Sequence, residues 1–112
     1  MNEALAAEFR ALIESLLAEL ELDEARGRGG QATVELDQQA VGRLSRMDAL
    51  QNQAMAKAGH ARRQAERRRL MAALARIDEG EFGYCEDCGE EIAEGRLRLD
   101  PAAQRCISCA NG

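Results

Sequence analysis

Aromatic residues are scarce in this 112-residue chain, which has no Trp, one Tyr and two Phe. Large globular cores are normally filled by such side chains, so this chain must build its core in another way. Proline is also rare, with a single residue, whereas Ala, Leu, Glu and Arg are abundant. This composition favours long helices and excludes a turn-rich all-β fold or a doubly wound α/β fold. We therefore expect an all-α protein.

Long apolar runs are absent as well. The stretch from Leu12 to Leu17 is interrupted by Glu14 and falls far short of the ~20 residues that span a bilayer. The amino terminus carries Glu3 and Glu8 and lacks a basic leader before an apolar block, so no secretory signal is visible. We expect a soluble, cytoplasmic protein with no membrane partner. No catalytic triad, phosphate loop or Cys/His pair is present, so we do not expect an enzyme.

Acidic and basic residues are separated along the chain, although the net charge is only −5. Residues 1–26 contain seven acids and two bases, whereas residues 57–76 contain seven bases and one acid. Each segment is therefore an electrostatic partner for the other. The basic run could alternatively dock on an acidic protein surface or contact DNA. The sequence pI of 4.9 and the lack of aromatic stacking residues argue against sequence-specific DNA binding.

Two amphipathic helices are predicted from the spacing of apolar residues. The first spans residues 3–26 and ends at three nearby glycines; the second spans residues 49–78. The apolar face of the first helix comprises Leu5, Phe9, Leu12, Leu16 and Leu20, and that of the second comprises Leu50, Ala54, Ala58, Ala61 and Ala65, continuing as Leu70, Leu74 and Ile77. Helices of similar length and opposite charge should pair antiparallel. We predict a two-helix coiled-coil hairpin over residues 1–79 with its tip at residues 27–48.

The strongest signal is a set of four cysteines in the pattern C-x2-C-x17-C-x2-C, namely Cys85, Cys88, Cys106 and Cys109. Two thiolate pairs at this spacing can surround one Zn²⁺ tetrahedrally, and four thiolates leave no open position for catalysis. We therefore predict one structural zinc per chain, holding a small finger over residues 80–112. A pair of disulfides, a redox-active C-x-x-C and an iron–sulfur cluster are the alternatives.

The cysteines lie within a longer characteristic run. It comprises Phe82-Gly83-Tyr84-Cys85-Glu86, Cys88-Gly89, Ile92, Arg96-Leu97, Pro101 and Cys106-Ile107, followed by Cys109. This run resembles the zinc finger of the DksA/TraR family of bacterial transcription regulators. The resemblance implies a protein that binds RNA polymerase, inserts an antiparallel coiled coil into its secondary channel and modulates initiation, often with the nucleotide ppGpp during the stringent response.

The resemblance carries over to the hairpin at single positions. Arg62 and Arg69 stand where longer family members have basic residues, whereas Asp100 replaces a basic residue of those members. The family's acidic tip motif D-x-x-D-x-A is absent, and Asp48 is the nearest remnant. Asp37 and Asp48 are therefore either tip acids that act on the polymerase or ordinary helix caps. A zinc-stabilised adaptor for another protein and a thiol redox switch are the alternative functions.

Overall fold

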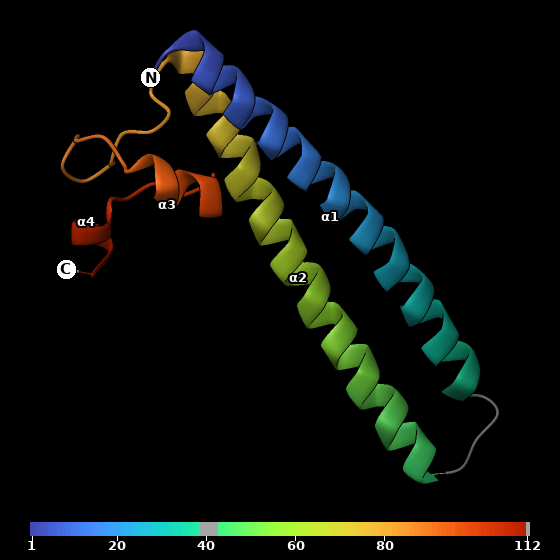
Figure 1. The fold of residues 1–112 in the computed structure, drawn as a ribbon. Helices are drawn as coiled ribbons and strands as arrows, with labels where there is room; N and C mark the ends of the chain where they lie inside the picture. Colours follow the sequence, from blue (N-terminus) through green and yellow to red (C-terminus); the bar gives the residue numbers. More distant parts are fainter. Residues whose placement is uncertain (39–42, 112) are drawn as a thin grey trace. The chain divides into compact units, whose positions relative to one another are not determined.

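The computed structural model describes the backbone of residues 1–38 and 43–111 and the side chains of residues 1–27 and 46–111. Its helices are α1 (Glu3–Gln38), α2 (Arg43–Glu79), α3 (Glu94–Leu99) and α4 (Ile107–Asn111), shown in Figure 1. One isolated antiparallel bridge, between Tyr84 and Glu91, is the extended pairing seen in the described residues. None of the described helices is long and apolar enough to cross a membrane.

The chain forms two compact units. The finger unit comprises residues 1–17 and 68–112, and the hairpin unit comprises residues 18–67. Each unit contains a part of both long helices. The prediction that residues 1–79 and residues 80–112 form separate domains remains a prediction.

Ion pairs within each unit show that α1 and α2 run antiparallel. In the finger unit, Arg10 of α1 pairs with Asp78 of α2. In the hairpin unit, Glu24 of α1 contacts His60 and Arg63 of α2. Residue numbers thus rise along one helix as they fall along the other. The predicted all-α fold, an antiparallel helical hairpin followed by a four-cysteine finger, is confirmed.

Both long helices extend further than we predicted. The first was expected to end at residue 26, yet α1 passes through Gly27 and continues to Gln38. Glycine costs a helix interior about 1 kcal/mol, a cost that packing against a second helix can offset. At position 27 there is also little room for a side chain, because a Cβ atom would lie 2.6 Å from Nη2 of Arg63. The second helix likewise begins at Arg43 rather than at residue 49.

The start of α1 and the end of α2 are capped in the ordinary way for helices. At the start of α1, Oδ1 of Asn2 accepts a hydrogen bond of 2.7 Å from the backbone N–H of Leu5, which satisfies one of the free donors of the first turn. After α2, Gly80 adopts a φ of 76°. This left-handed conformation favours glycine and ends the helix, so that the chain turns directly into the finger.

The apolar core lies in the finger unit. Its buried apolar residues come from α1, from α2 and from the finger, and they include Phe9, Ile13, Leu70, Ala73, Phe82, Cys85, Ile92, Leu97, Ala102 and Ala103. Among the described side chains of the hairpin unit, by contrast, Ala49 is the buried non-glycine apolar residue and Glu24 the buried charged one. The finger unit therefore supplies most of the hydrophobic stabilisation of the described chain.

The face of α2 that packs toward α1 differs from our prediction. Leu50, Ala54, Ala58, Ala61 and Ala65 were expected to face the first helix, but all five are exposed. The contacts with α1 in the hairpin unit come instead from the opposite face of α2, which carries polar residues and a buried glycine. The pattern of small apolar residues correctly predicts a helix there but assigns the wrong side to the contact.

Candidate metal centre

The first pair of cysteines lies on a tight loop after α2. The backbone N–H of Gly89 donates to the carbonyl oxygen of Cys85 at 2.9 Å, and that of Cys85 donates to the carbonyl oxygen of Glu90 at 2.8 Å. Gly89 has a φ of 75°, a conformation that L side chains rarely adopt. These bonds bend the backbone so that Cys85 and Cys88 point to one side, as a zinc knuckle requires.

The second pair lies at the start of α4. The backbone N–H of Ala110 donates to the carbonyl oxygen of Cys106 at 2.9 Å, so the first turn of this helix holds Cys106 and Cys109 on neighbouring positions. A bond of 2.8 Å from the N–H of Glu86 to the carbonyl oxygen of Gln104 ties the two loops together. The fold thus brings together two cysteine pairs that are 17 residues apart in the sequence.

The four sulfur atoms have the geometry of a tetrahedral zinc site. Their Sγ atoms all lie within 4.8 Å of one another, and those of Cys88 and Cys106 are 3.8 Å apart. A Zn–S bond of ~2.3 Å in a regular tetrahedron gives sulfur–sulfur distances of about 3.8 Å. All four residues are free cysteines rather than disulfides. The donor set therefore fits one structural Zn²⁺, with all four positions filled by protein.

The protonation of the thiols also favours a cation between them. Backbone N–H groups of Cys106 and Cys88 lower the pKa of Cys85 to about 6. The pKa of Cys109 is raised, chiefly by its hydrogen bonds with the sulfurs of Cys106, Cys85 and Cys88 and also by burial. One thiolate thus forms readily while its neighbours resist a second negative charge. A divalent cation removes this conflict and binds all four as thiolates.

Charged residues around the site connect the two knuckles. Nε of Arg105 lies 3.2 Å from carboxylate oxygens of both Glu86 and Asp87. These acids follow Cys85, whereas Arg105 precedes Cys106, so the ion pairs join the two loops next to the sulfurs. Nε of Arg96 donates to the carbonyl oxygen of Arg105 at 2.9 Å and links this loop to α3. The metal site is therefore supported by contacts beyond its ligands.

Apolar and charged contacts hold the finger against the ends of the long helices within the finger unit. The rings of Phe9 and Phe82 lie with centroids 5.4 Å apart. The guanidinium of Arg98 lies 5.5 Å from the centroid of Phe9 and contacts Glu8 at 3.2 Å and Glu94 at 3.0 Å. The finger is thus packed on α1 through an aromatic pair covered by an arginine.

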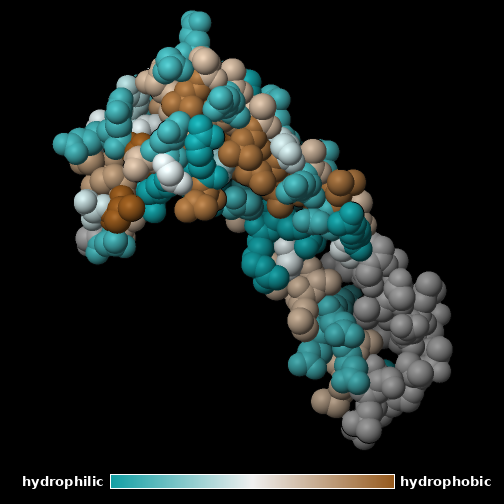
Figure 2. Space-filling model, in the orientation of Figure 1, coloured by the Kyte–Doolittle hydropathy of each residue, from teal (hydrophilic) through white to brown (hydrophobic). Residues whose placement is uncertain are grey.

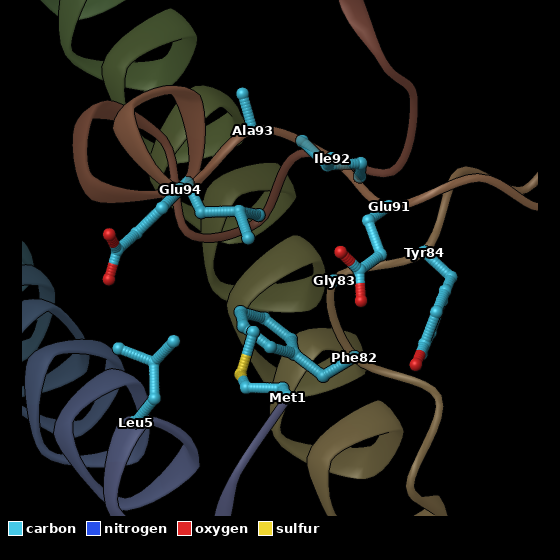
Figure 3. Close-up of a pocket in the computed structure, with 10 residues that line it drawn as sticks. Met1, Leu5, Phe82, Gly83, Tyr84, Glu91, Ile92, Ala93 and Glu94 are labelled. Carbon is cyan, nitrogen blue, oxygen red and sulfur yellow. The ribbon is translucent and has the colours of Figure 1, made fainter.

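A cleft of about 270 Å³ lies beside this aromatic pair (Figure 3). Phe82 and Met1 lie side by side in it, with Leu5 on one side and Tyr84 and Glu91 on the other. Gly83 has a φ of 90°, and a Cβ there would lie 2.9 Å from Cε of Met1. The cleft is where the start of α1 meets the turn that leads into the finger.

The predicted partner-binding residues are not gathered into one site. Arg62 is exposed on α2, whereas Arg69 forms an ion pair of 2.9 Å with Asp100 of the finger. Asp48 is exposed near the start of α2. Asp37 falls within α1, but its side chain lies outside the described residues. The roles proposed for these four residues stay predictions.

One polar cluster was missed by the sequence analysis. Glu24 is buried between the long helices, where it contacts Nδ1 of His60 and accepts a hydrogen bond of 3.0 Å from Nε of Arg63. These contacts lower the pKa of Glu24, with the bond to His60 contributing most. The signal for this cluster in the sequence was the presence of Gly27 and Gly59, because both glycines leave room for the guanidinium of Arg63.

Comparison with known proteins agrees with this geometry. Residues 80–112 match the prokaryotic dksA/traR C4-type zinc finger. A 42-residue stretch is 45% identical to the RNA polymerase-binding transcription factor DksA of Haemophilus influenzae, covering 38% of this chain and 29% of that protein. The protein of the same name from Escherichia coli K12 is 29% identical over 112 residues, covering 97% of this chain and 71% of that protein.

The similarity also holds for the fold of the whole chain. The solved structure of transcription factor DksA2 from Pseudomonas aeruginosa superposes with a TM-score of 0.88 at 24% sequence identity, covering 98% of this chain and 83% of that one. It shows that a pair of long helices and a small finger occur together in a known fold. The cysteine geometry and the match to the family model make residues 80–112 a zinc finger of the prokaryotic dksA/traR C4 type, which holds a structural zinc, and the chain as a whole is similar to DksA.

Proposed function

We propose that this chain is a transcription regulator that binds bacterial RNA polymerase through its helical hairpin and modulates initiation. The observation that carries the proposal is the extent of the similarity, which covers 97% of this chain in an RNA polymerase-binding factor and therefore includes the hairpin as well as the finger. A zinc finger alone could serve many unrelated functions. The proposal also places the protein in the cytoplasm, where the polymerase acts.

The finger and the hairpin would have different roles. Four cysteine ligands fill the zinc shell and leave no position for a substrate or a reactive water, so the finger is structural and the protein is not an enzyme. The hairpin supplies reach. α1 has 36 residues, and at ~1.5 Å per residue it is about 54 Å long. A helical pair of this length is suited to enter a channel of a large enzyme.

The acids near the tip would deliver the effect, and the basic residues would provide affinity. Asp48 is exposed at the start of α2, so its carboxylate is available to a partner. Arg62 is exposed on the same helix and is suited to an acidic polymerase surface. Truncating Asp48 should therefore change promoter open-complex lifetime more than polymerase affinity, whereas truncating Arg62 should mainly weaken binding.

We further propose that any ppGpp response depends on the ion pair between Arg69 and Asp100. Their guanidinium and carboxylate lie 2.9 Å apart, so a polyphosphate that approaches Arg69 must compete with a resident carboxylate. Asp100→Asn should then increase the effect of ppGpp on the protein's activity. The matched control is Asp78→Asn, which neutralises another exposed aspartate that pairs with an arginine and should leave the ppGpp response unchanged.

The proposal is tested by binding to purified core RNA polymerase. The zinc-loaded protein should bind at one copy per polymerase and should be displaced by a factor that occupies the secondary channel. Arg62→Glu should weaken binding, whereas Lys57→Gln, a milder charge loss on the same helix, should have a smaller effect. Failure of the folded wild-type protein to bind would reject the proposal and leave an adaptor for another protein as the alternative.

A further inference from the structure

The cleft beside Phe82 lies within the finger unit, and no described residue that lines it is a zinc ligand. Its floor is apolar, because Phe82, Ile92 and Leu97 are all buried. Met1 and Tyr84 line it as well and are partly exposed. Figure 2 shows exposed apolar surface in brown among polar side chains in teal over the finger unit. A concave apolar surface with a few polar groups at its edge is the usual form of a small-molecule site.

One wall of the cleft is fixed by backbone pairing. Tyr84 and Glu91 form an antiparallel bridge, and the backbone N–H of Ile92 donates to the carbonyl oxygen of Gly83 at 2.7 Å. Residues that face each other across an antiparallel pair project to the same side, so the phenol and the carboxylate stand together beside the cleft (Figure 3). Successive side chains of an extended segment point to opposite sides, and Glu90 does not line the cleft.

The charge at the cleft is negative. Residues 80–112 contain seven acids and three bases. Two acids line the cleft, Glu91 and Glu94, and Figure 3 shows them on opposite sides of Phe82. Arg98 pairs with Glu94 at 3.0 Å, whereas Glu91 has no ion-pair or side-chain hydrogen-bond partner among the residues that the structure describes. The cleft thus presents a carboxylate without a counter-ion next to buried apolar side chains.

These features select the chemical class of the ligand. Two carboxylates repel an anion or a nucleotide, and a neutral apolar molecule leaves Glu91 without a counter-ion. The cleft volume of about 270 Å³ lies below the ~300–1,000 Å³ of sites for drug-sized ligands, so the ligand is small. An ammonium group on a short aliphatic stem matches these observations, since the stem covers apolar side chains while the charged end pairs with a carboxylate. The ring of Tyr84 also attracts an organic cation.

We propose that this cleft is a binding site for a short aliphatic diamine, a molecule with an ammonium group at each end of a methylene chain. One ammonium group pairs with Glu91 and donates a hydrogen bond to the phenol oxygen of Tyr84. The methylene chain lies on Phe82 and Leu97, and the second ammonium group points toward Glu94. A lysine side chain of a partner protein has a similar stem but a single cation, so it matches one of the two acids.

An NMR titration of the zinc-loaded full chain with 1,4-diaminobutane, at constant ionic strength, tests the proposal. The amide signals of residues 83–84 and 91–94 should shift and reach saturation. Glu91→Gln should weaken binding about tenfold or more, because a charge-assisted hydrogen bond is lost. Glu90→Gln is the matched control, since it removes the same charge from the neighbouring exposed residue, and it should change the affinity less than about twofold. Zinc content and circular dichroism should be unchanged in both variants, because both positions are exposed.

A series of probes tests the parts of the ligand separately. Butylamine has one cation and should bind more weakly than 1,4-diaminobutane, while 1,4-butanediol has none and should not bind. Methylamine keeps one cation but lacks most of the stem. It should bind at least about tenfold more weakly than butylamine, because each buried methylene contributes a factor of about four. Acetyl-lysine amide represents a lysine of a partner protein and should bind no more tightly than butylamine.

Four results would overturn the proposal. Shifts that do not saturate, or that sodium chloride reproduces, mean that the cleft is not a specific site. Equal weakening by Glu91→Gln and Glu90→Gln places the diamine elsewhere on the acidic finger. Butylamine that binds as tightly as the diamine excludes a role for the second cation. Acetyl-lysine amide that binds more tightly than the diamine identifies the occupant as a side chain of a partner protein rather than a free amine.

Discussion

The aromatic pair between α1 and the finger offers a quantitative test of how the finger unit is held together. Phe9 and Phe82 are 1% and 4% exposed, with ring centroids 5.4 Å apart. Replacing a buried Phe by Ala typically costs about 3–5 kcal/mol, a large part of the ~5–15 kcal/mol that stabilises a typical domain. We expect a loss in this range for Phe9→Ala and for Phe82→Ala.

The two losses should not be independent. A packed aromatic pair contributes about 0.5–1.5 kcal/mol beyond its buried area, so the double variant should lose about 1 kcal/mol less than the sum of the single losses. Urea unfolding of the zinc-loaded protein, followed by circular dichroism and by zinc release, measures each loss. If the alanine variants do not fold, Phe9→Leu and Phe82→Leu allow the same double-mutant cycle with a smaller loss of stability. Leu22→Ala, at a residue that is 58% exposed, should cost less than about 0.5 kcal/mol.

Additive losses, within about 0.3 kcal/mol, would refute the reasoning. They would mean that Phe9 and Phe82 are buried separately and that the finger does not stabilise the start of α1 through this pair. Zinc release that precedes the loss of helicity by a wide margin in the wild type would point the same way, since the two events should be coupled if the rings share one core.

Further changes have defined outcomes. Purified protein should contain one zinc per chain by elemental analysis, and Cys88→Ser should lower zinc affinity and unfold the finger while most of the helicity remains. In Gly83→Ala the free energy of unfolding should fall by about 1–2 kcal/mol, because an L residue there must adopt a positive φ. In Gly95→Ala, at an open helix position, it should rise by up to about 1 kcal/mol. Thermal unfolding of the two variants distinguishes these outcomes. The folded pKa of Glu24 lies below its ordinary value of 4.5, so the stability advantage of the wild type over Glu24→Gln should be complete above pH 4.5 and shrink as the pH falls below it.

The sequence predicted the metal centre and the apolar face of α1 because both depend on short, specific spacings. Four cysteines in two C-x2-C pairs leave few alternatives to a tetrahedral metal. On α1, the large residues predicted to face the core include Phe9, which is 1% exposed, and Ile13 beside them is fully buried. Large apolar side chains have a strong preference for burial, and their helical spacing therefore identifies the packed side.

The orientation of α2 and the length of both helices were not predictable in the same way. Alanine gains little from burial and tolerates exposure, so a line of alanines such as Ala58 and Ala61 does not reveal which side faces the partner. Gly27 belongs to the glycines that were expected to end the first helix, and Gly59 lies within the second helix. In the structure both glycines make room for the guanidinium of Arg63. Gly27 and Arg63 are 36 positions apart along the chain, and local helix propensity does not describe a contact over that separation.

The central proposal is that this chain, which is similar to DksA, acts on RNA polymerase through its hairpin. It is tested most directly by the affinity of the zinc-loaded protein for core RNA polymerase, measured with and without a competing occupant of the secondary channel. We expect stoichiometric binding that the competitor abolishes and that Arg62→Glu weakens. Binding that persists unchanged in the presence of the competitor, or no binding by the correctly folded protein, would contradict it.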